Sequence, residues 1–283
     1  MGAHEPDIAE ARSGARPHDR TELWLSLLQR LTNEHPDWAT WKNVDSAMAG
    51  TGDIDSLAPP NSWSAIQATF VDWATARGFG PVISCPHILM GPHLVTFEPG
   101  ADFILQLDVK ERATFRGSTL IDVDMLRPLT VLDPRGVRRI RSGADGVVRL
   151  CSNGIRPGGD ADPGAIRVKR IRELLADDPE GAEAMARHFG PVRGDLLAGV
   201  RAVAEGGWDR RAMRRVELWA LMRSVAEPWT VARRIWFARV WKNRCPVVRT
   251  IRQEERRVPP DLDGWLDEVR ASHDVIDTRT VSR

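Results

Sequence analysis

The chain has 283 residues, 42% of them hydrophobic, so it is long enough for one large domain or two ordinary ones, and its composition argues against global disorder. Its formal net charge of +1 gives the whole molecule no electrostatic preference for nucleic acid or membrane. Three widely separated cysteines without a CxxC pair, and no apolar run near the ~18 residues that span a bilayer, predict reduced thiols in a cytoplasmic protein.

The N-terminal half of the chain predicts an α+β domain over residues 21–135. Residues 1–20 are rich in Gly, Pro, Ala and charge, so we expect a flexible tail there and no secretory signal. A helix is expected from Thr21 to about Pro36, because leucines recur at helical spacing after a capping hydroxyl. Apolar runs between Gly and Pro turns predict the remaining elements. The expected strands are 38–45, 53–57, 81–85, 94–97 and 103–109, and the second helix is 61–78.

After about Asp133 the pattern changes to helical segments separated by loops rich in Gly and Pro. The expected helices are 165–176, 179–188, 194–204, 210–225, 231–242 and 262–272. This pattern predicts a helical C-terminal lobe over residues 136–283. The expected fold class is therefore α+β, followed by a mostly α-helical lobe.

The motif with most chemical content is Gly50-Thr51-Gly52-Asp53-Ile54-Asp55. Two aspartates one residue apart on a strand point their carboxylates to the same side. Asp108, in the expected strand 103–109, offers a third carboxylate. Hard oxygen ligands suit Mg²⁺, and two such ions about 3.5–4 Å apart can hold a triphosphate and an attacking hydroxyl. The glycines before Asp53 let backbone N–H groups approach phosphate.

With Leu105-Gln106-Leu107-Asp108-Val109 downstream, this motif resembles the DNA polymerase β-like nucleotidyltransferase superfamily over about residues 21–124. Its members carry an hG[GS] element, a D-h-[DE] pair and a third carboxylate on a later strand. The resemblance implies a mixed sheet with flanking helices. It also implies Mg²⁺-dependent transfer of a nucleoside monophosphate from an NTP to a hydroxyl acceptor, with Asp53, Asp55 and Asp108 as the catalytic ligands of two Mg²⁺ ions.

The Gly-Ser pair of that superfamily is absent from its expected place, where Lys42-Asn43 stands. By resemblance, Lys42 and Asn43 would take over contact with the triphosphate, and Gly50, Thr51 and Gly52 would shape the turn beside it. A single lysine is a good point charge for phosphate. The same departure supports an alternative: a catalytically degenerate protein of this fold that binds nucleic acid or another protein.

The aspartates also have simpler interpretations. Asp53 and Asp55 can be polar residues of a turn, and Asp108 can end a half-buried strand that faces solvent. Asp122-x-Asp124 is a second pair with the same spacing. It precedes a helical pattern, so helix capping is preferred over metal binding for this pair.

Two further features attract attention for their chemistry. Cys85, His87 and His93 fit no standard zinc spacing, so a structural or surface role is preferred for them. Lys42 lies in an expected strand flanked by tryptophan, where a buried lysine is rare without a partner.

Residues 229–252 interleave arginines with tryptophans, within a stretch from Arg201 to Arg257 that holds 15 basic and 6 acidic residues. Such a segment can bind nucleic-acid backbones and stacked bases, or lie as an amphipathic helix on a membrane surface. The preferred interpretation is an ordinary helix that packs Trp236 and Val240 inward, with its arginines outside. Because arginines and tryptophans are interleaved in it, nucleic acid is kept as a candidate partner of this segment.

Overall fold

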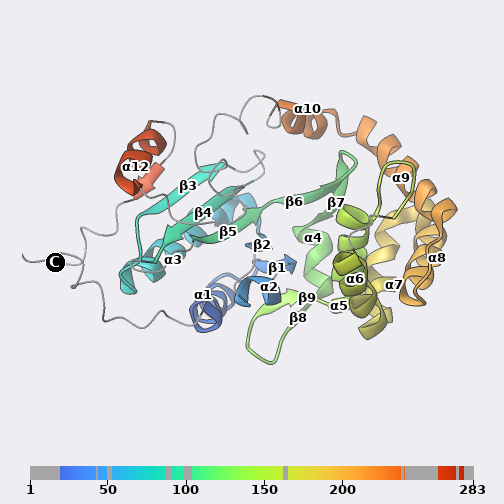
Figure 1. The fold of residues 1–283 in the computed structure, drawn as a ribbon, viewed down its shortest axis with the longest axis horizontal. Helices are drawn as coiled ribbons and strands as arrows, with labels where there is room; N and C mark the ends of the chain where they lie inside the picture. The colour runs from blue at the N-terminus through green and yellow to red at the C-terminus, as the bar shows by residue number, and fades with distance from the viewer. Residues whose placement is uncertain are drawn as a thin grey trace, which may run out of the picture.

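An eight-stranded mixed sheet joined to a set of helices forms the architecture of the computed structural model (Figure 1). The structure describes residues 20–42, 44–49, 53–86, 91–98, 104–161, 165–236, 239, 261–271 and 274–276. The expected tail before Arg20 lies outside these residues, as do Asn43, Gly50, Thr51, Gly52 and most of 237–252. Within the described part of the chain, no helix is both long and apolar enough to cross a membrane.

The strands of the main sheet follow the spatial order β10-β3-β4-β5-β2-β1-β9-β8. Two neighbouring pairs, β2 with β5 and β1 with β9, are parallel, and the other pairs are antiparallel. The strands are β1 (Ala39–Lys42), β2 (Ile54–Leu57), β3 (Val82–Pro86), β4 (Pro92–Phe97), β5 (Ile104–Lys110), β8 (Thr130–Leu132), β9 (Arg138–Ile140) and β10 (Asp274–Ile276). A separate hairpin pairs β6 (Arg112–Phe115) with β7 (Ser118–Asp122).

The helices divide between the sheet and the C-terminal part of the chain. Those of the first half are α1 (Arg20–Glu34), α2 (Val44–Met48), α3 (Trp63–Ala76) and α4 (Val123–Leu126). Those of the second half are α5 (Ser142–Arg149), α6 (Ala165–Asp177), α7 (Pro179–Ala186), α8 (Arg193–Ala204), α9 (Arg210–Val225), α10 (Pro228–Trp236) and α12 (Leu262–Arg270). A π-helical turn, Leu150–Gly154, follows α5.

Opposite faces of the sheet have different neighbours. Leu105, Leu107 and Val109 of β5 belong to the same buried cluster as the apolar sides of α1 and α3. Because side chains alternate along a strand, the residues between them face the other side of the sheet. At the β3–β4 end, that other side is covered by Leu266 and Val269 of α12. Near β1 and β2 the core continues into the helices of the C-terminal half.

The α+β class and the central mixed sheet with flanking helices are confirmed. Most expected elements are present within a few residues of their expected ends. The expected strand 38–45 is wrong in its second half, because β1 stops at Lys42 and Asp45 lies in α2. The hairpin β6–β7 and the strands β8 and β9 were not expected, and β9 pairs with β1 from beyond the expected domain boundary at 135.

Helix α5 was not expected, and its two glycines explain why. Glycine lowers helix propensity, so Gly143 and Gly146 weaken the sequence pattern. In the structure, a Cβ at Gly143 would lie 1.8 Å from the backbone oxygen of Asp178, and one at Gly146 would lie 2.8 Å from Leu175. These glycines therefore allow α5 to approach α6 and α7 closely.

Candidate metal centre

Four ionisable side chains form a row across the sheet, one on each of four neighbouring strands. The Cα pairing joins His93 of β4 to Asp108 of β5, Asp108 to Asp55 of β2, and Asp55 to Lys42 of β1. Directly paired residues of neighbouring strands point to the same face of a sheet. The row therefore lies on one face, opposite the side that packs on α1 and α3.

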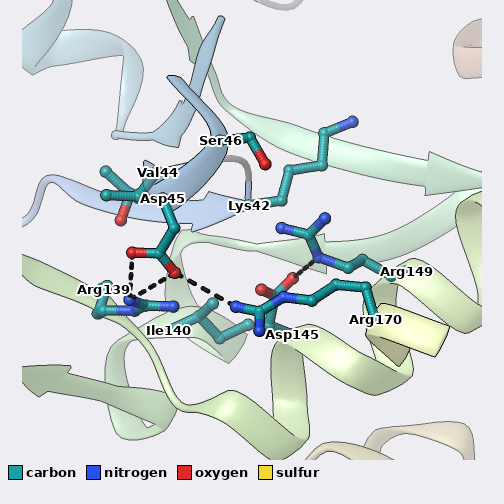
Figure 2. Close-up of a pocket in the computed structure, with 10 residues that line it drawn as sticks. Lys42, Val44, Asp45, Ser46, Arg139, Ile140, Asp145, Arg149 and Arg170 are labelled. Carbon is teal, nitrogen blue, oxygen red and sulfur yellow. Dashed lines mark hydrogen bonds and ion pairs between the residues drawn. The ribbon is translucent and has the colours of Figure 1, made fainter. Parts of the chain in front are cut away.

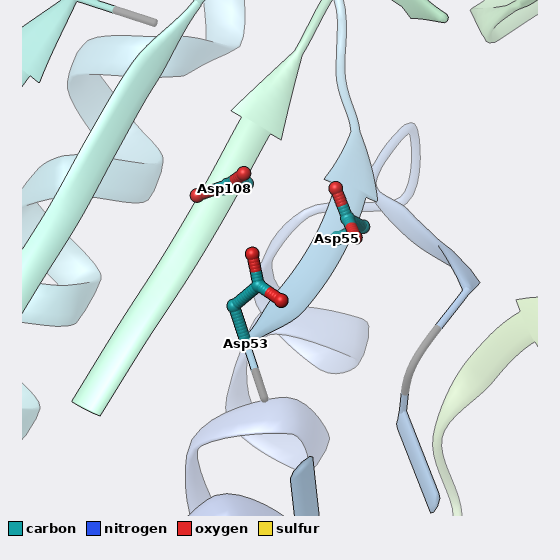
Figure 3. A group of neighbouring side chains, drawn as sticks. All are labelled: Asp53, Asp55 and Asp108. Atoms are coloured by element: carbon teal, nitrogen blue, oxygen red, sulfur yellow. The ribbon is translucent and has the colours of Figure 1, made fainter. Parts of the chain in front are cut away.

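Three carboxylates gather at the middle of this row (Figure 3). Asp53 immediately precedes β2, Asp55 lies within it, and Asp108 lies at the same level on β5. Ligand oxygens from all three lie within 4.8 Å of one another. The hydroxyl of Ser56 donates to the backbone oxygen of Asp108 at 2.8 Å, which adds a link between the two strands. The arrangement offers oxygen ligands from two neighbouring strands, and divalent cations such as Mg²⁺ prefer oxygen ligands.

Two lysines pair with these carboxylates. The Lys110 ammonium lies 2.7 Å from Asp55 and 3.2 Å from Asp108, so it bridges the two strands. Lys42 lies 3.3 Å from the other oxygen of Asp55. Both ammonium groups also lie near the ring of Trp41, at 4.6 Å for Lys42 and 5.8 Å for Lys110 from its centroid. Burial lowers the pKa of Lys110, but Asp55 and Asp108 outweigh this effect and raise that pKa above its ordinary value.

Gln106 and His93 make further polar contacts with Asp108. The side-chain amide of Gln106 donates to Asp108 at 2.7 Å and to Asp53 at 3.3 Å, so it joins two of the carboxylates. The Nδ1 atom of His93 is in close contact with the Asp108 carboxylate. Asp55 and Asp108 are each only 2% exposed, whereas Asp53 is partly exposed. Access to the carboxylates from solvent is therefore greatest beside Asp53.

A small pocket adjoins this centre through Lys42 (Figure 2). It is lined by residues of β1, α2, β9, α5 and α6, among them Lys42, Ser46, Arg139, Arg149 and Arg170. Its two acidic residues are already paired. Asp45 contacts Arg139 and Arg170, each at 3.3 Å, and Asp145 contacts Arg149 at 2.7 Å. Because Lys42 pairs with Asp55 of the metal centre, the pocket itself sets three arginines against two aspartates and carries a small excess of positive charge.

The structure brings the three predicted aspartates together and places Lys42 beside them. Asn43, Gly50, Thr51 and Gly52 lie outside the described residues. The solvent-facing interpretation of Asp108 is wrong, because the residue is buried among polar partners. Asp122 caps α4 by accepting a hydrogen bond from the Met125 N–H at 2.9 Å, as expected.

Sequence reasoning did not place Lys110, Gln106 or His93 beside the aspartates, and it assigned His93 a structural or surface role. The first two could have been found, since residues 106, 108 and 110 alternate along one strand and must share a face. His93 could not, because its place beside Asp108 depends on the pairing of β4 with β5. Cys85 pairs with His93 in register but lies in the apolar cluster beneath α12, so the two residues form no evident metal site.

Comparisons of this chain with protein-family models, with curated proteins and with solved structures found no match.

Proposed function

We propose that this protein is a Mg²⁺-dependent nucleotidyltransferase that moves a nucleoside monophosphate from an NTP to a hydroxyl acceptor. The observation that supports the proposal most is the convergence of Asp53, Asp55 and Asp108 from two parallel strands. Their oxygen donors and their spacing fit a hard divalent cation. When bound there, Mg²⁺ would neutralise the charge that develops on the phosphates during transfer.

The position of each residue at the centre suggests its role in the proposed reaction. Asp55 and Asp108, both buried and held by hydrogen bonds or ion pairs, would supply fixed ligands. Asp53, the most exposed of the three, lies on the side where a nucleotide would enter. Gln106 would orient Asp53 and Asp108 together. Asp108 would also accept the proton of the acceptor hydroxyl, as a positioned carboxylate can.

The balance of charge supports uptake of a cation together with a nucleotide. When all are ionised, three carboxylates and two lysines leave the centre with a net charge of −1. That charge suits one divalent ion, and a second would arrive with the phosphates, since Mg²⁺ is usually held by one or two carboxylates plus substrate phosphates. Lys42, at the edge of the small basic pocket, would contact the triphosphate.

Calorimetric titration of the protein with each NTP, with and without Mg²⁺, tests this function. We expect Mg²⁺-dependent binding of at least one NTP. Asp53→Asn and Asp108→Asn should each weaken that binding more than about tenfold, because each removes a charged ligand of the cation. The nucleotide that binds best would then be used to screen acceptors for release of pyrophosphate.

Asp124→Asn is the matched control for these variants. Asp124 belongs to a pair with the same D-x-D spacing, but it is exposed within α4 and lies apart from the three carboxylates. This variant should bind the NTP as the wild type does. Unchanged binding in a correctly folded Asp108→Asn protein would contradict the proposed function.

A specific observation favours the alternative, a catalytically degenerate binding protein. Lys110 places its own cation between Asp55 and Asp108, where a metal ion would otherwise sit. Under this alternative, the wild type binds no NTP with Mg²⁺. It would instead bind RNA or DNA in a salt-dependent manner, and that binding would survive the loss of Asp53 and Asp55.

A further inference from the structure

Helix α10 is turned with its tryptophans outward and one of its arginines inward. Trp229 is 79% exposed and Trp236 44% exposed, and residues 229, 233 and 236 share one helical face. On the opposite side, Arg234 donates a close hydrogen bond to the hydroxyl of Thr114 in β6. This orientation is the reverse of the one that the sequence favours, in which Trp236 packs inward.

The inward side of α10 is fixed by the β6–β7 hairpin. A Cβ at Gly117 would lie 3.1 Å from the side chains of Val231 and Ser224, so the hairpin turn approaches both helices closely. Burial lowers the pKa of Arg234, as expected for a guanidinium that faces protein rather than water. The outward position of Trp229 and Trp236 is therefore set by contacts on the other side of the helix.

The last turns of α9 carry an exposed apolar stripe that leads to Trp229. Leu218, Leu221, Met222 and Val225 are spaced as neighbours on one helical face, and all four are 44–80% exposed. Large apolar side chains that are contiguous and exposed mark a site of interaction with a protein or a membrane. We call the surface formed by these four residues, Trp229, Ile235 and Trp236 the α9–α10 surface.

Most of the exposed charged residues around the α9–α10 surface are basic. Residues 211, 214 and 215 are exposed arginines on the same helical face as the apolar stripe, one to two turns earlier, and Arg233 is exposed on α10. Arg215 pairs with Asp195 at 2.8 Å, and two other acidic residues of this region turn inward. Glu217 pairs with Arg116 at 2.7 Å, and Glu227 accepts hydrogen bonds from Thr119. The exposed charge beside the apolar stripe is therefore predominantly positive.

We propose that the α9–α10 surface docks on the surface of an anionic lipid bilayer. Exposed apolar side chains flanked by arginines fit an interface of acyl chains and negative headgroups, where each basic residue adds attraction. Most of the surface is aliphatic, which gives nucleic-acid bases little to stack on. A second copy of the chain would bring the same arginines together. This inference stands apart from the proposed catalytic function, because it uses none of the residues of the candidate metal centre.

Vesicle flotation tests the docking directly. The full-length protein is mixed with vesicles of phosphatidylcholine alone or of an equal mixture with phosphatidylglycerol. We expect it to float with the anionic vesicles only, and less at high salt because the headgroup attraction is screened. The triple variant Met222→Gln/Val225→Gln/Trp229→Gln should bind the anionic vesicles at least about tenfold more weakly, since it removes exposed apolar area.

Leu132→Gln is the matched control, because Leu132 lies in β8 and is 66% exposed, close to the 67% of Met222. This variant should float as the wild type does. Failure of the wild type to float, or equal flotation of the triple variant, overturns the proposal. So does a vesicle-free dimer, detected by sedimentation velocity, that the triple mutation abolishes. Single-stranded RNA binding that the triple mutation abolishes, without vesicle binding, would assign the surface to nucleic acid instead.

Discussion

At the scale of single residues, Lys110 decides the charge of the candidate metal centre. Its ammonium reaches Asp55 from the last residue of β5 and remains within 3.2 Å of Asp108. Two carboxylates buried side by side would repel each other without a cation between them. Lys110 therefore offsets this repulsion when no metal ion is present, and it would compete with an ion for the same oxygens.

Lys110→Met should lower the free energy of unfolding by about 3–5 kcal/mol, because it removes the ammonium that both buried carboxylates contact. Mg²⁺ should restore part of this loss in the variant, since the ion can then occupy the place of the ammonium. Urea denaturation with and without Mg²⁺ measures both effects. The exposed Lys169 of α6 provides the control, and Lys169→Met should change stability by less than about 0.5 kcal/mol. A Lys110→Met protein as stable as the wild type would disprove this account.

At the scale of elements, one aspartate joins two helices of the C-terminal half, α5 and α7. Asp178 precedes α7 and accepts a hydrogen bond from the Gly181 N–H at 2.9 Å. It also accepts from the Gly143 N–H of α5 at 3.1 Å and from Arg141 at 2.6 Å. Partial burial raises the pKa of the Asp178 carboxyl, but these hydrogen bonds outweigh it and hold that pKa below its usual value.

Asp178→Ala should therefore lower the free energy of unfolding by about 2–3 kcal/mol near neutral pH, more than the loss of an ordinary helix cap would. A carboxyl with a lowered pKa in the folded protein contributes stability above its unfolded pKa of about 3.9, and loses it as pH falls through the folded value. The difference between wild type and variant should thus shrink below about pH 4. Chemical denaturation of both proteins between neutral pH and below pH 4 measures this difference in the free energy of unfolding. Asp209→Ala, which removes only the hydrogen bond to Ala212 that caps α9, should cost about 1 kcal/mol.

The close approach of α5 to α7 predicts opposite effects for two Gly→Ala changes. At Gly143 the added Cβ would meet the Asp178 backbone 1.8 Å away, so Gly143→Ala should destabilise the protein by more than about 2 kcal/mol. At the exposed Gly194 of α8 nothing lies within 4 Å, so Gly194→Ala should add up to about 1 kcal/mol through helix propensity. Thermal unfolding of both variants shows whether each change raises or lowers the stability of the protein. Equal effects would show that packing between α5 and α7 does not limit stability.

At the scale of the whole molecule, the C-terminal α12 returns to cover the N-terminal sheet (Figure 1). Leu266 is fully buried against a cluster that includes Cys85 and Phe97. The ring of Phe97 meets Trp265 edge-on at 5.8 Å. The face that carries the candidate metal centre is therefore closed at its β3–β4 end by residues from more than 150 positions away in the chain.

Leu266→Ala should lower the free energy of unfolding by about 2–5 kcal/mol through the cavity that it creates. It should also loosen α12 and speed the reaction of Cys85 with a thiol reagent. Cys151 serves as an internal control, because it is buried in the other core, where burial raises its pKa to about 12 and keeps it unreactive. The comparison is made in a Cys245→Ser background. Equal protection of Cys85 in wild type and variant would mean that α12 does not shield this part of the sheet.

The sequence by itself determined the fold class, most helices and the positions of the three aspartates, two on β2 and β5 and one immediately before β2. These features depend on local patterns: helical spacing of apolar residues, alternation along strands, and Gly and Pro at turns. The expected bounds of α6 and α9 agree with the structure to within one residue for this reason. Capping was likewise predicted correctly for Asp122 from its local context, whereas Asp124 lies inside the helix.

Only the tertiary structure decided which side chains meet. The contacts of His93 with Asp108 and of Lys110 with Asp55 follow from the register between strands, which no local pattern specifies. The place of β9 beside β1 likewise depends on a parallel pairing across almost a hundred residues. The helix α10 is the clearest case. Its sequence is amphipathic, but periodicity does not say which face docks, and contacts with the β6–β7 hairpin turned Arg234 inward and Trp229 outward.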